Sequence, residues 1–344
     1  MAKVIQQDKS VQTLRGFAII LVVMGHVIGY KGDEGMKVAD DSFWRWLYYS
    51  LEYFRMPLFT VISGWVYTLH PISKENINKF LDGKTRRLLV PLVAVGLIYF
   101  FIRLVAPGTN REVHLSDIWK IFVYQYDLYW YLPSLFWAFL LIAFVEYQSW
   151  MKKLSSWFLV LVITIIFLSL RNIYLTTVPN YLGLIGMFYL MPFFVIGIGI
   201  GRFPKLMTNK IFVNSMLFLF LAGIVVQQLA WFQLIDLPFH GKASPLGLLV
   251  GMTGTIVLFR VHLVIPSLVY IGGFSYAIYL FHVFGTAGSR IFLYKFGLIH
   301  PVVIFFVSLI VGIIVPIVME MVIDRFKLTR FLFLGRKYAP KRKK

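Results

Sequence analysis

The sequence predicts an all-α integral membrane protein with about ten transmembrane helices around a polar cavity. Of its 344 residues, 59% are hydrophobic and 14% are charged, and the mean hydropathy is +0.77, which lies far from the composition of a water-soluble domain. Apolar runs of about twenty residues recur along the chain, the length that a helix needs to cross a hydrocarbon core roughly 30 Å thick. Strands of a membrane barrel would instead alternate over about ten residues. We therefore expect one transmembrane domain over residues 1–344.

Ten apolar segments are expected to span the membrane. In chain order they are 14–30, 44–69, 88–105, 129–147, 157–170, 181–201, 211–232, 246–259, 266–285 and 301–323. The first is expected to be a retained helix and not a signal peptide, because no small-residue cleavage site follows its apolar core. A basic tail, residues 325–344, follows the last span.

The distribution of Lys and Arg predicts the orientation. With the N-terminus in the cytoplasm, the cytoplasmic segments hold 23 of the 34 basic residues, the opposite side holds 10, and Arg55 lies within a span. The positive-inside rule therefore places both termini in the cytoplasm of a multi-pass cell-membrane protein. Topology and the anionic lipid of the bilayer account for the net charge of +19 and for the basic tail, so we expect no nucleic-acid partner.

Cysteine is absent, which excludes disulfides, thiolate metal ligands and a cysteine nucleophile. Any catalysis must use other groups. We expect no metal site and no permanently bound cofactor.

The first predicted span carries two ionisable residues, Arg15 and His26. A charge inside the bilayer costs at least ~2.5 kcal/mol, so such residues are by default functional candidates. They are eleven residues apart, which on a helix is three turns plus about 20° and a rise of roughly 16 Å. They therefore share a face that suits a long ligand with an anionic end and a reactive end. Alternatively, Arg15 anchors the helix by reaching the interface, and Glu52 holds His26 in a structural role.

The second span contains Glu52, Arg55, Pro57 and the pair Ser63-Gly64. Pro57 frees a backbone carbonyl and Gly64 allows close approach, so this helix is expected to be broken or kinked against a polar cavity. Glu52 and Arg55 are spaced i and i+3 and would alternatively neutralise each other.

In the ninth span, Ser275, Tyr279 and His282 fall at i, i+4 and i+7. They are expected to form a polar stripe that faces the interior of the bundle, as a site or as hydrogen bonds between helices.

Taken together, these motifs resemble the membrane acyltransferase 3 family, multi-span enzymes that O-acylate carbohydrates and other cell-envelope molecules. The resemblance rests on motifs in family order from the first span to the ninth: Arg15 with His26, FRMPLFTVISG at 54–64, the basic cluster KTRR at 84–87, WYL at 130–132 and FSYAIYLFH at 274–282. It covers essentially the whole predicted membrane domain.

This resemblance implies a cytosolic acyl-CoA donor, most often acetyl-CoA, which is a substrate and not a resident cofactor. It implies that His26 activates an acceptor hydroxyl on a cell-surface or lipid-linked carbohydrate. It also implies an acyl-CoA site at the inner face, formed by Arg15, Lys84, Arg86, Arg87 and Trp130.

Two features depart from the family. The first basic position is Lys84, where many members have Arg, and the C-terminal esterase-like domain of many members does not follow the last span. We therefore expect the chain to hand the acyl group directly to its acceptor, or to work with partner proteins of envelope-polysaccharide biosynthesis.

The remaining roles follow from the chemistry of acyl transfer. Neutral His26 would act as general base and Glu52 would orient it, while His282, Ser63 or Tyr279 would donate to the developing oxyanion. Two other functions compete with this one. A secondary transporter or flippase would also carry intramembrane charges, but the two halves of the chain show no similarity. A sensor or scaffold would need a partner-binding domain.

Overall fold

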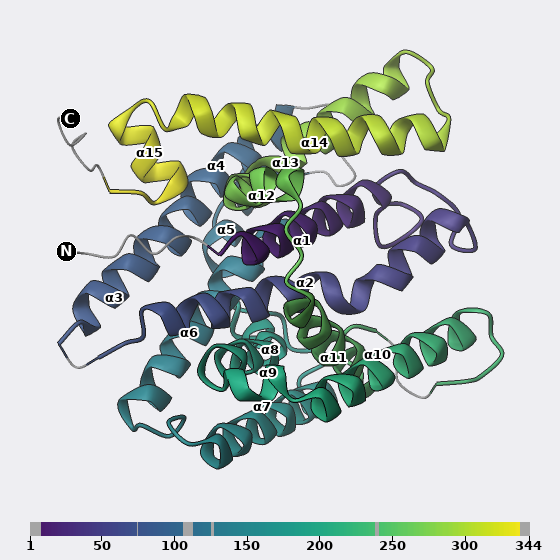
Figure 1. The fold of residues 1–344 in the computed structure, drawn as a ribbon. Helices are drawn as coiled ribbons and strands as arrows, with labels where there is room; N and C mark the ends of the chain where they lie inside the picture. The colour runs from purple at the N-terminus through teal and green to yellow at the C-terminus, as the bar shows by residue number, and fades with distance from the viewer. Residues whose placement is uncertain (1–7, 74, 106–112, 125–126, 238–240, 338–344) are drawn as a thin grey trace.

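The computed structural model describes residues 8–73, 75–105, 113–124, 127–237 and 241–337, and Figure 1 shows their arrangement. Within these ranges the chain is helical, apart from loops and one β-bridge between Tyr124 and Tyr181. The longer helices are α1 (Lys9–Ile28), α2 (Phe43–Leu69), α4 (Val90–Val105), α6 (Tyr131–Tyr147), α7 (Leu154–Tyr174), α8 (Leu184–Arg202), α10 (Lys210–Trp231), α11 (Pro245–Val261), α13 (Ser275–Lys295) and α14 (Pro301–Ile323). The shorter ones are α3 (Ile77–Lys84), the π-helical turn η1 (Thr85–Leu89), the 3₁₀ turns η2 (Leu115–Asp117) and η3 (Asp127–Tyr129), α5 (Lys120–Val123), α9 (Pro204–Thr208), α12 (Pro266–Gly273) and α15 (Lys327–Leu334).

The all-helical class is confirmed for the described residues, whereas the count of ten spans is not. By length and composition, six continuous helical segments qualify as spans, and a bent pair brings the number to seven. The six are α1, the run from α3 through α4, α7, α8, α10 and α14. Helices α2 and α13 have 27 and 21 residues but carry polar and charged side chains, which lower their hydropathy.

The predicted ninth span, 266–285, does not form one helix. Its first part is α12, which ends at Gly273, and its second part belongs to α13, which continues to Lys295. Helix α12 follows α11 after a sharp bend of 118°. The apolar run is continuous through this region, but Gly272 and Gly273 are poor helix formers and allow the chain to turn.

Helix α1 lies at the centre of the bundle, as Figure 1 shows. In α1, 72% of the apolar window is buried inside the protein, against 11% in α10. It contacts α2, α12, α13 and α14. The approach to α12 is close enough that a Cβ on Gly16 would overlap the carbonyl oxygen of Leu268. Small residues allow such contacts between helices in a membrane, so the two ionisable residues of α1 are held at the core.

Helices α2 and α8 pack in the same manner. A Cβ on Gly64 would overlap the carbonyl oxygen of Phe194, and a Cβ on Gly197 would overlap that of Val61. Helix α2 runs without a break through Pro57, so the expected break is absent. Packing against α8 thus holds α2 beside α1.

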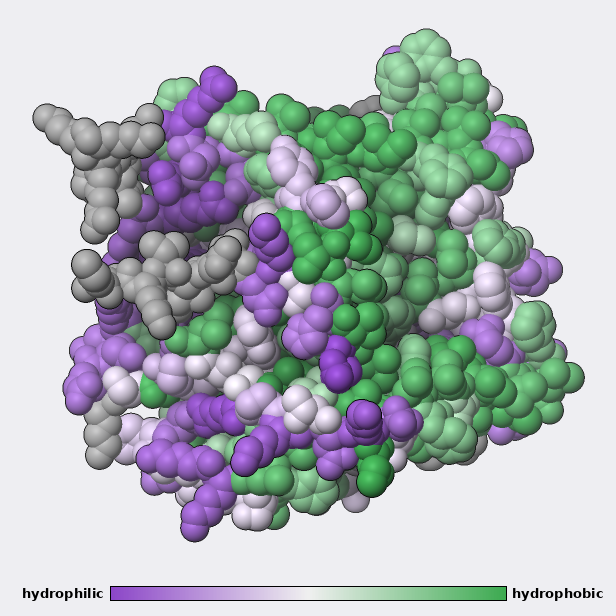
Figure 2. Space-filling view, viewed as in Figure 1, coloured by the Kyte–Doolittle hydropathy of each residue, from purple (hydrophilic) through white to green (hydrophobic). Residues whose placement is uncertain are grey.

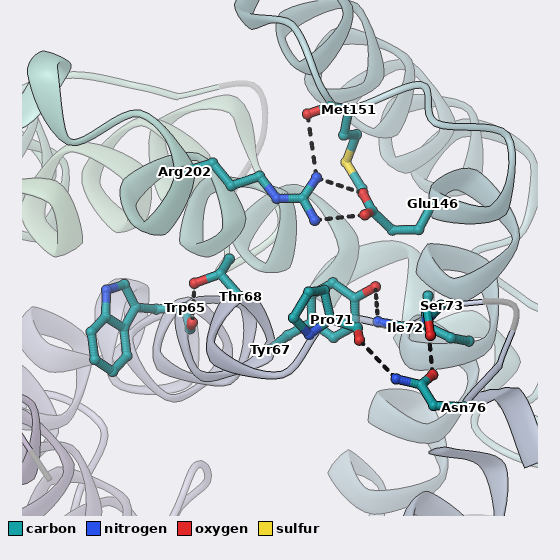
Figure 3. A network of polar contacts seen from close by, with 10 residues as sticks. All are labelled: Trp65, Tyr67, Thr68, Pro71, Ile72, Ser73, Asn76, Glu146, Met151 and Arg202. Carbon is teal, nitrogen blue, oxygen red and sulfur yellow. Dashed lines mark hydrogen bonds and ion pairs between the residues drawn. The ribbon is translucent and has the colours of Figure 1, made fainter. Parts of the chain in front are cut away.

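Polar contacts join α6 to α8, and others lie along the connection from α2 to α3, as Figure 3 shows. Arg202 of α8 donates to both carboxylate oxygens of Glu146 at 2.7 and 2.6 Å and to the carbonyl oxygen of Met151 at 3.3 Å. The Tyr67 hydroxyl accepts from the backbone N–H of Ile72 at 3.3 Å, which shapes the connection from α2 to α3. The Tyr67 contact holds the segment that leads toward the basic motif at 84–87.

The surface separates into polar and apolar regions. Figure 2 shows hydrophilic residues gathered toward the side where α3 and α15 lie, and a broad hydrophobic surface over much of the remaining face. Large apolar side chains on the outer helices are exposed, among them Phe158, Phe218 and Phe306. Such a surface is suited to contact with lipid.

Candidate active site

Two histidines meet at the centre of the bundle. The rings of His26 on α1 and His282 on α13 have centroids 4.9 Å apart. His26 is half-buried, and His282 is completely buried. The predicted stripe of Ser275, Tyr279 and His282 does face the interior, since all three side chains are buried.

The hydrogen bonds of His282 determine its tautomer. Its Nδ1 lies 3.0 Å from the carbonyl oxygen of Ile278 and 2.9 Å from that of Tyr279. Both partners are acceptors, so Nδ1 must carry the proton, and the neutral ring then presents a lone pair at Nε2. Nε2 is buried and has no hydrogen-bond partner among the described residues. Neutral His282 is therefore a hydrogen-bond acceptor beside His26.

A cavity of about 560 Å³ opens beside His26. Its walls come from α1, α2, α4, α13 and the connection after α1. The polar or aromatic residues that line it are His26, Tyr30, Glu34, Tyr48, Arg55, Tyr99, Arg103, Phe284, Thr286 and Arg290. We call it the His26 cavity. It lies toward the end of α1 that is opposite Arg15.

Arg55 reaches the His26 cavity from α2. Its guanidinium carbon lies 4.2 Å from the centre of the Tyr48 ring. The guanidinium also rests against Gly25, where a Cβ would overlap Nη1 and lie 2.6 Å from Cζ. Gly25 precedes His26, so the absence of a side chain at this position lets Arg55 lie next to the histidine.

A second set of polar side chains surrounds Arg15 at the other end of α1. Arg15 lies 3.4 Å from the Gln12 side-chain oxygen and within electrostatic range of Glu320 and Arg336. Arg336 donates to Glu320 at 2.6 Å. Tyr276 lies within range of Arg336 and donates its hydroxyl to the carbonyl oxygen of Arg87. The Arg15 cluster is defined as Arg15, Arg87, Tyr276, Glu320 and Arg336.

The predicted basic motif 84–87 divides between two environments. Arg87 is exposed in the Arg15 cluster, and Arg86 donates to the carbonyl oxygen of Gly335, which joins η1 to the end of α15. The Lys84 ammonium lies over the rings of Phe139 and Phe80, 3.4 and 5.1 Å from their centroids. Its charge is thus directed toward aromatic faces.

Glu52 and Trp130 lie in a third region. Glu52 is buried and has an electrostatic neighbour in Lys242, while no hydrogen bond to His26 is found within the described part of the chain. The Lys242 ammonium lies 5.0 Å from the centre of the Trp130 ring and 5.7 Å from that of Tyr189. Burial lowers the pKa of Lys242, and Glu52 opposes this effect. Trp130 contacts Tyr131, Tyr189 and Lys242, none of which belongs to the Arg15 cluster.

Ser63 and Tyr279 use their hydroxyl protons elsewhere. Ser63 donates to the carbonyl oxygen of Phe59 at 3.0 Å and lies 3.3 Å from the Tyr131 hydroxyl. Tyr279 donates to the carbonyl oxygen of Leu128 at 2.9 Å. Both hydroxyls thus donate to backbone carbonyls, whereas Arg55 lines the same cavity as His26.

Several residues of these regions were missed as site candidates from the sequence. The sequence places Arg336 only in the basic tail, and Arg103, Lys242 and Arg290 only among the basic residues outside the cytoplasm. Their charge gave a signal, but no sequence pattern placed them beside His26 or Arg15. Within the described residues, no group of three or more His, Cys, Asp or Glu side chains could hold a metal ion.

Comparisons with known proteins give the family. No curated protein and no solved structure matched the chain. The model of the acyltransferase 3 family, described as an acyltransferase domain, matches residues 8–321, from the start of α1 to near the end of α14. The match includes both histidines and all of the predicted site residues. The chain belongs to the acyltransferase 3 family and is a membrane acyltransferase.

Proposed function

We propose that the chain transfers an acetyl group from cytosolic acetyl-CoA to a hydroxyl of a cell-surface or lipid-linked carbohydrate. The observation that carries the proposal is the position of Arg15 and His26 on one buried helix. Helix α1 is continuous from Lys9 to Ile28, so the two residues lie about 16 Å apart along its axis. Arg15 lies in the Arg15 cluster, and His26 lines the His26 cavity.

The Arg15 cluster would hold the phosphates of the donor. Phosphates are bound well by guanidinium groups, which donate in pairs with fixed geometry. Arg15, Arg87 and Arg336 supply three such groups, and Glu320 balances part of their charge. A donor anchored here would extend along α1 and bring its thioester to His26. Both termini would then lie in the cytoplasm, as the charge distribution predicts.

His26 would act as the general base. The unaided acceptor hydroxyl has too high a pKa to attack, so neutral His26 takes its proton while the hydroxyl oxygen bonds to the thioester carbonyl carbon. The carbon–sulfur bond of the tetrahedral intermediate then breaks, and the CoA sulfur leaves with the proton that His26 returns. Arg55 would donate to the carbonyl oxygen as it gains negative charge.

His282 would act as a positioning residue. Its Nε2 is buried without a hydrogen-bond partner among the described residues, and the two ring centroids are only 4.9 Å apart, so a rotation of the His26 ring would bring one of its N–H groups to this nitrogen. The other nitrogen of His26 would then be the free base. This arrangement replaces the carboxylate that orients the base in many hydrolases, and it uses His282 as an acceptor.

The test compares His26→Gln with wild-type protein in lipid nanodiscs. Glutamine keeps hydrogen bonding but cannot take the proton, so transfer from radiolabelled acetyl-CoA to an envelope glycan extract should fall by about 10²-fold or more. The matched control is His300→Gln, an exposed histidine at the start of α14, which should retain activity. Near-normal transfer by folded His26→Gln would remove His26 from the chemistry.

A further inference from the structure

The His26 cavity carries more positive charge than acyl transfer to a neutral sugar requires. Arg55, Arg103 and Arg290 line it, together with one carboxylate, that of Glu34. The three guanidiniums come from three different helices, α2, α4 and α13. Since charged groups inside a helical bundle are costly, their convergence on one cavity needs an explanation beyond packing.

Within the described part of the chain, Arg290 lacks the carboxylate partner that two other half-buried arginines have. Arg202 binds Glu146, and Arg336 binds Glu320, each at 2.6 Å. Arg290 is half-buried at the cavity wall, and among the described residues it forms no ion pair with a carboxylate. Its electrostatic neighbours are two tyrosines, Tyr99 and Tyr294. Its positive charge is therefore left for a ligand in the cavity.

The two tyrosines beside Arg290 do not provide an anion to pair with its guanidinium. Tyr294 donates its hydroxyl to the carbonyl oxygen of Met36 at 3.0 Å, so it is already used in the fold. The Arg103 guanidinium carbon lies 5.6 Å from the centre of the Tyr99 ring. Two guanidiniums and an aromatic ring thus line the same part of the wall. Guanidinium groups are specific for carboxylate and phosphate, and tyrosine rings suit the faces of sugars.

We propose that the acceptor carries an anionic carboxylate or phosphate group, which Arg290 binds. This inference rests on the proposed function, because it names the class of acceptor that enters the His26 cavity. On α13, Arg290 lies eight residues beyond His282, about 12 Å along the helix axis. The anion therefore lies away from the reacting hydroxyl and fixes the register of the acceptor, while Arg55 remains beside His26.

The test measures binding without acetyl-CoA, so it does not depend on transfer. Wild-type protein in nanodiscs of zwitterionic phosphatidylcholine is titrated with octyl glucuronide, octyl glucoside and octyl phosphate. Wild-type protein should bind at least one anionic probe about tenfold more tightly than octyl glucoside, the size of one charge-assisted hydrogen bond. Arg290→Gln should lose this preference. The control Lys295→Gln, an exposed cation at the end of α13, should keep it.

The two anionic probes distinguish the source of the charge. Preference for the glucuronide indicates an acidic sugar, and preference for octyl phosphate indicates the phosphate of a lipid carrier. Equal binding of all three probes, or an unchanged preference in Arg290→Gln, would overturn the inference. Absence of acetyl transfer combined with Arg290-dependent anion binding would instead refute the proposed function and leave the anion site in place.

Discussion

Replacement of Gly25 by alanine should move Arg55 without unfolding α1. The added Cβ would overlap Arg55 Nη1 and lie 2.6 Å from Cζ. Carbon atoms in contact need about 3.5 Å, so Cζ must retreat by about 1 Å and Nη1 by more. These atoms are the far end of a flexible side chain, so the backbone of α1 can keep its position. Alanine is also the better helix former, by up to about 1 kcal/mol.

The expected effect is on the chemical step. If Arg55 donates to the oxyanion, its displacement resembles removal of one oxyanion donor, which costs about 10²–10³ in kcat. Acetyl-CoA affinity should stay unchanged, because the Arg15 cluster lies at the other end of α1. Gly83→Ala is the matched control, since a Cβ there meets nothing within 4 Å.

The assay is acetyl transfer by Gly25→Ala, Arg55→Ala and the double variant. Gly25→Ala should lower kcat strongly in the wild-type background and by less than about twofold in the Arg55→Ala background, because both changes remove the same interaction. An unchanged kcat in Gly25→Ala would refute the role of Arg55. So would an equal loss in both backgrounds, which would show that the substitution acts through something else.

Two further predictions concern donor binding and packing. Arg87→Glu reverses an exposed charge of the Arg15 cluster and should weaken acetyl-CoA binding, measured by calorimetry, by about tenfold or more. The acetyl-CoA affinity of the wild-type protein should also fall with added salt. An affinity that responds to neither change would remove Arg87 from the donor site. Gly197→Val would push a side chain into the carbonyl oxygen of Val61 and should destabilise the α2–α8 contact by about 1–3 kcal/mol. This loss should lower the midpoint of thermal unfolding. An unchanged midpoint would show that the two helices can separate without cost.

The sequence could predict much of the central helix. The spacing of Arg15 and His26 places them on one face, and the spacing of Ser275, Tyr279 and His282 predicts the buried stripe, because both arguments need only the period of a helix. Hydropathy is continuous across Phe274 and does not reveal the break between α12 and α13, although the pair Gly272-Gly273 gives a local signal for it. Span 266–285 was wrong for this reason.

The site could be predicted only in part for a similar reason. Helix periodicity gives the face of a residue but not its partner on another helix. Gly25 carries no chemistry of its own in the sequence, yet its missing side chain places Arg55 beside His26. The aromatic environment of Lys84 and the position of Trp130 beside Lys242 likewise depend on contacts between distant segments. Such contacts leave no pattern along a single chain.

We propose that α1 connects a donor site on one side of the membrane to an acceptor cavity that opens toward the other. The most direct test of this claim uses sealed proteoliposomes in which labelled termini report the orientation. Acetyl-CoA should support transfer only when it is supplied on the side of the termini, where the Arg15 cluster lies. Transfer only with acetyl-CoA on the opposite side, or equally from both sides, would contradict the claim.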